Sequence, residues 1–198
     1  KDNDKTKVGL LSFLKYWKEA PTDYRKLMLG LLTFTLFNSS DIFLLLKAKE
    51  SGLTDTQVIG VYIFYNLIYA LFAFPLGSIA DKIGLKKMYI IGISIFTIVY
   101  FGVGLSNNFY VVGAMFLLYG IYSAATEGIS KAWISNICEK KDTATAIGTY
   151  TAFQSILTMI ASSLAGLLWY NFGPSMSFIV TGFASFFVVV YLSVFMKK

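Results

Sequence analysis

Long stretches without a charged residue dominate the chain. No Asp, Glu, Lys or Arg occurs in residues 56–80, 88–126 or 143–196. About 20 apolar residues are enough to cross the roughly 30 Å hydrocarbon core of a bilayer as a helix. The apolar runs are continuous and do not alternate with polar residues, which excludes the strands of a membrane β-barrel. The sequence therefore predicts an all-α, polytopic membrane protein.

Turn residues divide these stretches into six predicted spans. Ser-Asn-Asn at 106–108 breaks the second stretch, and Asn-Phe-Gly-Pro at 171–174 breaks the third. A further stretch near the start of the chain contains one charge, Asp41, and has room for one more helix. The predicted spans are 27–46, 57–79, 88–105, 109–136, 144–170 and 175–196. Together they form one transmembrane domain, a bundle over residues 27–198.

Composition narrows the possible chemistry. Hydrophobic residues make up 56% of the chain and charged residues 14%, which is too apolar for a soluble domain of this size. The chain has no His and a single Cys, Cys138, so we expect no internal disulfide, no metal site and no cofactor. Neither a nucleotide-binding loop nor paired catalytic carboxylates on adjacent helices are present, so we do not expect an enzyme.

The basic residues are distributed unevenly between the two sides of the predicted bundle. Of 17 Lys and Arg residues, 14 lie on the side that holds both termini, whereas the other side holds only Lys47 and Lys49. The positive-inside rule then places both termini in the cytoplasm and predicts a plasma or bacterial inner membrane protein. This topology explains the net charge of +6 without a nucleic acid partner.

Residues 1–26 are predicted to form a cytoplasmic linker. Within them, residues 8–18 place apolar side chains at helical spacing beside lysines, typical of a helix that lies on the membrane face. A partly ordered linker is the alternative. Both interpretations suit a connection to a segment before residue 1.

A cytoplasmic loop between the second and third predicted spans carries a motif. It reads Gly77-Ser-Ile-Ala-Asp81-Lys82-Ile-Gly84-Leu85-Lys86-Lys87. On physical grounds we expect Gly77 to allow close helix approach and Gly84 to adopt a positive φ. We expect Asp81 to accept from helix N-terminal amides or to pair with a base.

The loop resembles the signature loop of the major facilitator superfamily, whose transporters have twelve helices in two six-helix halves. The match holds at Gly77, Asp81, Lys82, Gly84 and Lys86, whereas Leu85 stands where the family usually has a base. The basic start resembles the linker between halves, and residues 119–128 resemble helix ten of bacterial members of unassigned substrate. The resemblance implies a C-terminal half that works with an N-terminal six-helix half and carries a small-molecule substrate by alternating access.

The resemblance also implies that the first, second, fourth and fifth spans line a central cavity, with the third and sixth as outer supports. Polar side chains on those four spans form stripes at helical spacing. The candidates for a substrate or proton site are Glu127, Lys131, Tyr119, Tyr122, Ser123, Tyr65, Asn66, Tyr69, Gln154, Asn38 and Asp41. The alternative is that such stripes only hold the helices together within the membrane lipid that surrounds the bundle.

Glu127 and Lys131 have two possible roles. A charge near the bilayer centre costs about 3 kcal/mol, so both must face protein or water. Glu127 then either titrates as a proton site or contacts a cationic part of the substrate, with Lys131 as counter-charge, or the two form a self-neutralising pair. Asp41 is a candidate gate or cap at the outer mouth. An alternative function for the whole chain is a complete six-helix protein that acts as a homodimeric channel or scramblase.

Overall fold

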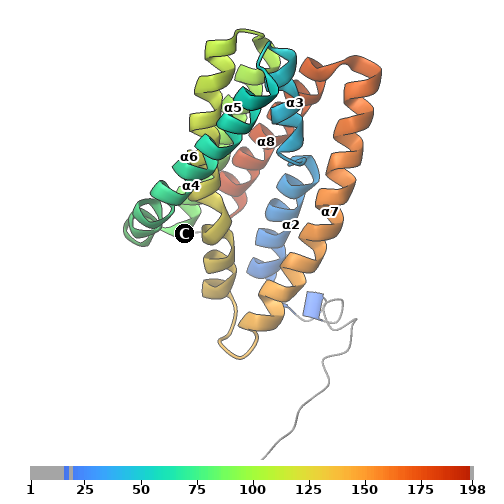
Figure 1. Ribbon diagram of the computed structural model, residues 1–198. Coiled ribbons are helices and arrows are strands. Elements are labelled where there is room, and N and C mark those ends of the chain that lie inside the picture. Colours follow the sequence, from blue (N-terminus) through green and yellow to red (C-terminus); the bar gives the residue numbers. More distant parts are fainter. Residues whose placement is uncertain (1–15, 18–19, 197–198) are drawn as a thin grey trace, which may run out of the picture.

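The computed structural model describes residues 16–17 and 20–196, which form a bundle of long helices without a strand among them (Figure 1). The helices are α2 (Thr22–Phe37), α3 (Ile42–Glu50), α4 (Asp55–Ile83), α5 (Leu85–Leu105), α6 (Phe109–Ile137), α7 (Thr143–Phe172) and α8 (Pro174–Phe195). Within the described residues, six segments are long and apolar enough to cross a membrane, α2 and α3 together counting as one. The predicted six-span, all-α fold is confirmed.

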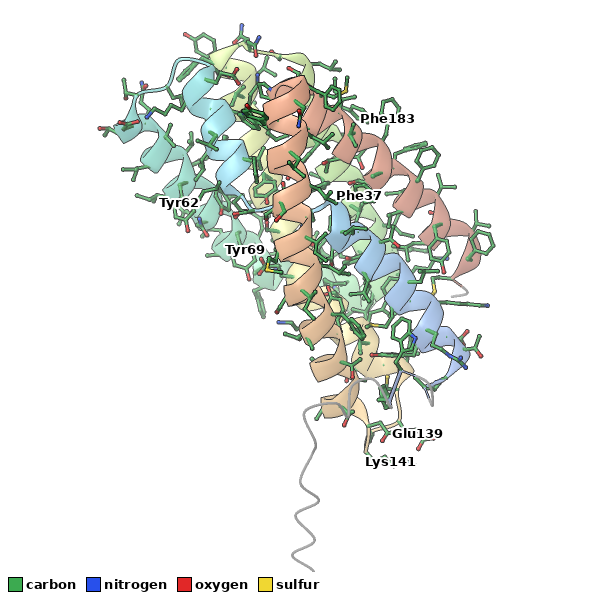
Figure 2. All side chains as sticks on the ribbon, turned by 90° about the vertical axis from the view of Figure 1, so that its right-hand side faces the viewer. Phe37, Tyr62, Tyr69, Glu139, Lys141 and Phe183 are labelled. Carbon is green, nitrogen blue, oxygen red and sulfur yellow. The ribbon has the colours of Figure 1, made fainter. Side chains whose placement is uncertain are left out.

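The two ends of the bundle are distinguished by their connections. The α3–α4, α5–α6 and α7–α8 connections lie at the top of Figure 1, and we call this the Lys47 end. The start of α2 and the α4–α5 and α6–α7 connections lie at the opposite end, the Asp81 end. In Figure 2 the α6–α7 turn lies at the bottom, where Glu139 and Lys141 form an ion pair of 2.9 Å.

The first span is broken, although the sequence predicted one helix over residues 27–46. It begins at Thr22, inside the range predicted as linker, and residues 38–41 separate α2 from α3. The break has the sequence Asn-Ser-Ser-Asp, whose short polar side chains compete with the helix for backbone hydrogen bonds. Ser40 Oγ, for example, accepts from the backbone N–H of Ile42 at 3.4 Å. Most of the predicted amphipathic segment lies outside the described residues.

Helix α5 lies at the centre of the packing within this bundle. It packs most extensively against α6 and α8, and α4 packs against α6. A Cβ added at Gly92 would lie 2.5 Å from Thr126 Cγ2, so a glycine is needed for α5 to approach α6 this closely. The Phe96 and Tyr100 rings stack in the core with centroids 3.9 Å apart. Only the opposite face of α5, with Ile91 and Ile98, is exposed.

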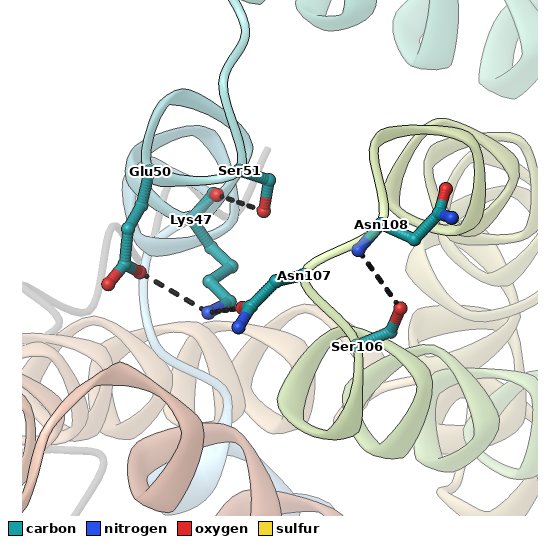
Figure 3. A network of polar contacts seen from close by, with 6 residues as sticks. All are labelled: Lys47, Glu50, Ser51, Ser106, Asn107 and Asn108. Atoms are coloured by element: carbon teal, nitrogen blue, oxygen red, sulfur yellow. Dashed lines mark hydrogen bonds and ion pairs between the residues drawn. The ribbon is translucent and has the colours of Figure 1, made fainter.

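A buried lysine ties α3 to the α5–α6 turn at the Lys47 end (Figure 3). The Lys47 side chain is 2% exposed, and its Nζ donates to Asn107 Oδ1 at 2.7 Å and pairs with Glu50 Oε2 at 3.3 Å. A buried charge is tolerated only when such partners replace its water. Just beyond α3, a capping box between Thr54 and Gln57 begins α4. Lys47 therefore fixes the C-terminal part of α3 against the α5–α6 turn.

Candidate substrate cavity

A cavity of about 570 Å³ lies among α2, α4, α6 and α7 and the 38–41 break. All eleven side chains predicted as a substrate or proton site line it. The cavity is also lined by Tyr62, Thr126 and Ser130, which belong to the predicted polar stripes, and by Phe34, Thr35, Tyr89 and Tyr150. The fold thus brings together polar groups that are up to 119 positions apart in the sequence, from Thr35 to Gln154.

Four of the lining residues were missed from the sequence. Tyr150 precedes Gln154 by four residues on α7, so helical spacing was a signal that could have revealed it. Tyr89 belongs to α5, a helix expected outside the cavity, and nothing in the linear pattern marks it. Phe34 and Thr35 lie in the last turn of α2 before the break. The sequence predicted a continuous helix there, so nothing marked these two residues as part of the cavity.

The 38–41 break places Asp41 in the cavity, where two tyrosine hydroxyls bind it. Tyr119 donates to Oδ1 at 2.5 Å, and Tyr65 donates to Oδ2. Hydrogen bonds to an ionised carboxylate are shorter and roughly twice as strong as neutral ones. We call Asp41, Tyr65 and Tyr119 the aspartate–tyrosine cluster. The Asp41 side chain makes no capping hydrogen bond to α3, and its role as a gate or cap at the outer mouth stays a prediction.

A second polar contact lies one turn away from the cluster. Asn38 Nδ2 donates to the Tyr122 hydroxyl at 3.0 Å. The Tyr65 and Tyr122 rings flank Tyr119, each with its centroid 5.3 Å from that of Tyr119. The break is therefore attached to α4 and α6 through side chains at both its ends.

Gly120 lets α4 and α6 approach closely enough to form the cluster. A Cβ added there would lie 2.7 Å from the Tyr65 backbone oxygen and 2.8 Å from Ile68 Cβ. Backbone atoms cannot move aside as a flexible side chain can. The residue next to Tyr119 in sequence therefore sets the separation between Tyr119 and Tyr65.

Glu127 and Lys131 line the same cavity, nearer the Asp81 end, and both are exposed. The ion pairs found among the described residues are Lys47–Glu50, Lys49–Asp55 and Glu139–Lys141, so the predicted self-neutralising pair is absent there. Tyr69 of α4 instead lies close enough to Glu127 for the two side chains to interact. Figure 2 shows Tyr69 and Tyr62 along the same side of α4.

The signature-loop residues gather elsewhere, at the Asp81 end. Gly77, Asp81 and Lys82 lie in the last turns of α4, and Gly84 has a φ of +96°, as expected. Lys86 Nζ donates to the backbone oxygens of Ser193, at 3.1 Å, and Met196. A lysine at this position stabilises the C-terminus of α8 through the helix dipole.

Two expectations for the loop are not met within the described part of the chain. A Cβ added at Gly77 would meet no atom within 4 Å, so no helix of this bundle approaches it. Asp81 is exposed and forms none of the ion pairs found there. Asp81, Gly84, Lys86 and Lys87 instead line a second cavity of about 670 Å³.

Candidate metal ligands do not cluster in the part of the chain that the structure describes. No group of three or more His, Cys, Asp or Glu side chains suited to a metal ion occurs in residues 16–17 and 20–196. In the cavity among α2, α4, α6 and α7, Asp41 instead accepts hydrogen bonds from the hydroxyls of Tyr65 and Tyr119. The arrangement suits the recognition of a polar or charged solute.

Comparison with known proteins identifies the class. The family model described as Major Facilitator Superfamily matches residues 27–198. An uncharacterized MFS-type transporter, MJ1317, of Methanocaldococcus jannaschii is 33% identical over 168 residues, which are 82% of this chain and 42% of that protein. The multidrug resistance protein Stp of Mycobacterium tuberculosis is 35% identical over 105 residues, 52% of this chain and 20% of that protein.

The chain therefore belongs to the major facilitator superfamily, a family of membrane transporters. It is an integral membrane protein, with six spans in the part that the structure describes. The chain spans less than half the length of the curated relatives it matches.

Proposed function

We propose that these six helices are the C-terminal half of a secondary transporter that moves a small solute across the membrane by alternating access. The observation that carries this proposal is the cavity, in which polar side chains from four spans converge around two carboxylates. In transporters built from repeats, substrate sites lie near the bilayer midplane between the repeats. An N-terminal six-helix half then completes the site from the opposite side.

The length of the relatives supports a partner half. The M. jannaschii protein aligns over 42% of its length, which leaves more than half of it for further helices. The exposed face of α4, with Ile63, Leu67 and Leu71, is an apolar surface on which such a half can pack. We further propose that both termini are cytoplasmic, because 14 basic residues lie on their side of the bundle.

Proton coupling is part of the proposal, with Glu127 as the titrating group. Counting 1.5 Å per residue from Ile137, Glu127 lies about 15 Å from the Asp81 end of α6, close to the bilayer centre. It is exposed to the cavity and lacks an ion-pair partner among the described residues. A carboxylate in that position can exchange a proton when the cavity changes the side to which it opens.

The test is the accessibility of the cavity from each side. In the full-length protein, Gln154→Cys is introduced with Cys138→Ser and treated with a membrane-impermeant maleimide in vesicles of both orientations. A second sample adds Asp81→Asn, which we expect to shift the balance between inward-facing and outward-facing states. Labelling should then rise from one side and fall from the other.

Two results would contradict alternating access. Labelling that is fast and equal from both sides indicates a continuous pore, the homodimeric channel considered as the alternative function. A lack of labelling from either side, in protein that runs as a single species on size exclusion, indicates that the cavity does not open at all. Thr54→Cys, at the Lys47 end, serves as the control for vesicle orientation.

A further inference from the structure

We propose that the cavity selects an organic cation, with its positive charge at Glu127 and its apolar or aromatic body against the tyrosine rings. This inference names the substrate class and therefore rests on the transport function proposed above. Four observations carry it: the use of hydrogen-bond donors, the balance of charges, the exposure of the rings and the size of the cavity.

The hydrogen-bond donors around Asp41 are engaged within the protein. The hydroxyls of Tyr65 and Tyr119 donate to Asp41, so only their oxygen lone pairs stay available to a ligand. Asn38 Nδ2 likewise donates to the Tyr122 hydroxyl, and the Asn38 Oδ1 atom is buried. Around Asp41, the oxygens of the carboxylate and of the two tyrosines therefore carry negative partial charge.

The formal charges of the cavity sum to a negative value. Asp41 and Glu127 line the cavity together with one cation, Lys131. Glu127 is not held by Lys131, because no ion pair between them is found in the described part of the chain. An exposed carboxylate that forms no ion pair attracts a cation and opposes the entry of an anion.

Tyrosine rings supply the surface for the body of the ligand. Tyr62 is 45% exposed, and its ring meets that of Tyr65 edge to face, with centroids 5.4 Å apart. Tyr69 belongs to the same stripe of α4 as Tyr62, and it lies beside Glu127 of α6. The face of an aromatic ring carries negative charge density and attracts a cation within about 6 Å. A cavity of about 570 Å³ is within the range that holds drug-sized ligands.

The test uses two probes of the same shape and opposite charge. Tetraphenylphosphonium and tetraphenylborate are equilibrated by dialysis with the purified full-length protein in detergent, and saturable binding is separated from partition into micelles. We expect saturable binding of the phosphonium and none of the borate. Glu127→Gln should weaken phosphonium binding by about tenfold, and Tyr62→Leu by about two- to fivefold.

The matched control is Tyr170→Leu, which removes an 87% exposed tyrosine that does not line the cavity, and it should leave binding unchanged. Variants are compared only when they elute as a single species and unfold at temperatures close to that of the parent protein. Absence of saturable phosphonium binding would overturn the inference, as would equal binding of the borate or normal phosphonium binding in both Glu127→Gln and Tyr62→Leu.

The outcome is independent of the accessibility test. Saturable phosphonium binding by a protein whose cavity never changes side would refute the transport mechanism and leave the ligand class standing. Alternating accessibility without phosphonium binding would leave the mechanism standing and refute the ligand class.

Discussion

Two carboxylates lie in the same cavity in contrasting surroundings. Asp41, at the start of α3, is bound by hydroxyls from two other helices, whereas Glu127, in α6, is exposed and lies beside Tyr69. Tyr119 and Glu127 are eight residues apart on α6, so the two sites are separated by about 12 Å along that helix. One carboxylate thus organises helices, and the other is free to change partners.

The difference shows how a polar group in a membrane protein acquires a role. Each tyrosine hydroxyl bound to Asp41 is worth about 1.5–3 kcal/mol, and together they join α3 to α4 and α6. Disrupting those bonds has a structural cost, so Asp41 is suited to couple a helix movement to the state of the cavity. Glu127 has no comparable contacts to disrupt, so a proton or a ligand can bind it at little structural cost.

Asp41→Asn should have the largest effect. The amide cannot accept both tyrosine protons as a carboxylate does, so α3 loses its attachment, and transport should fall by about ten- to a hundredfold. Uptake by the full-length protein in vesicles measures this. Asp55→Asn is the control, because Asp55 forms an exposed ion pair with Lys49 at 2.7 Å, and such pairs contribute little. Equal losses in both variants would contradict the special role of Asp41.

The double variant Glu127→Gln with Lys131→Met tests the second carboxylate. If Glu127 serves only to neutralise Lys131, removing both charges should preserve transport. A proton or substrate role predicts a loss of about tenfold at normal expression, together with a flatter dependence of uptake on pH. Unchanged uptake with an unchanged pH profile would refute that role.

Gly120→Ala tests whether the α4–α6 contact positions the cluster. The added Cβ meets the Tyr65 backbone, so α4 must shift away from α6, and the free energy of unfolding should fall by about 1–3 kcal/mol. Thermal unfolding in detergent measures this change. Gly113→Ala is the matched control on α6, because a Cβ there meets no atom within 4 Å. A destabilisation of Gly113→Ala as large as that of Gly120→Ala would contradict the explanation.

A labelling experiment determines which of the two carboxylates lies nearer the outside of the cell. We expect its cysteine substitutions to leave activity unchanged. With Cys138→Ser as background, Ser51→Cys should react with an impermeant maleimide from outside intact cells, and Lys140→Cys should not. The background change is minor, because burial raises the pKa of the Cys138 thiol and leaves little reactive thiolate at neutral pH. The opposite labelling pattern would reverse the topology and place Glu127, not Asp41, nearer the outside.

Much of the cavity was predictable because helical spacing survives folding. A stripe such as Tyr62, Tyr65, Asn66 and Tyr69 lies on one face of any helix, so its members reach the same cavity together. The break at 38–41 was not predicted. The apolar residues on both sides of it together have the length of one span, so the pattern predicted a single helix. The sequence also did not predict that α5 lies at the centre of the packing. Hydropathy shows that a helix is apolar, but it does not distinguish a helix that faces lipid from one that is buried among other helices.

The sequence by itself determined the number of spans, the class of the fold and the set of polar residues available to a site. Uncharged stretches of sufficient length leave a chain no alternative to spanning helices in a bilayer, because every backbone polar group must be satisfied within the helix. These features depend on local composition and spacing, which a linear pattern contains.

Only the tertiary structure decided which of those polar residues contact one another. The sequence left a Glu127–Lys131 pair open because the two are neighbours on one helix, whereas in the structure Glu127 lies beside Tyr69 and Asp41 binds Tyr65 and Tyr119. Contacts between helices depend on how closely and at what angle they cross. Here that approach depends on a missing Cβ at Gly120, whose consequence exists only once α4 lies against it.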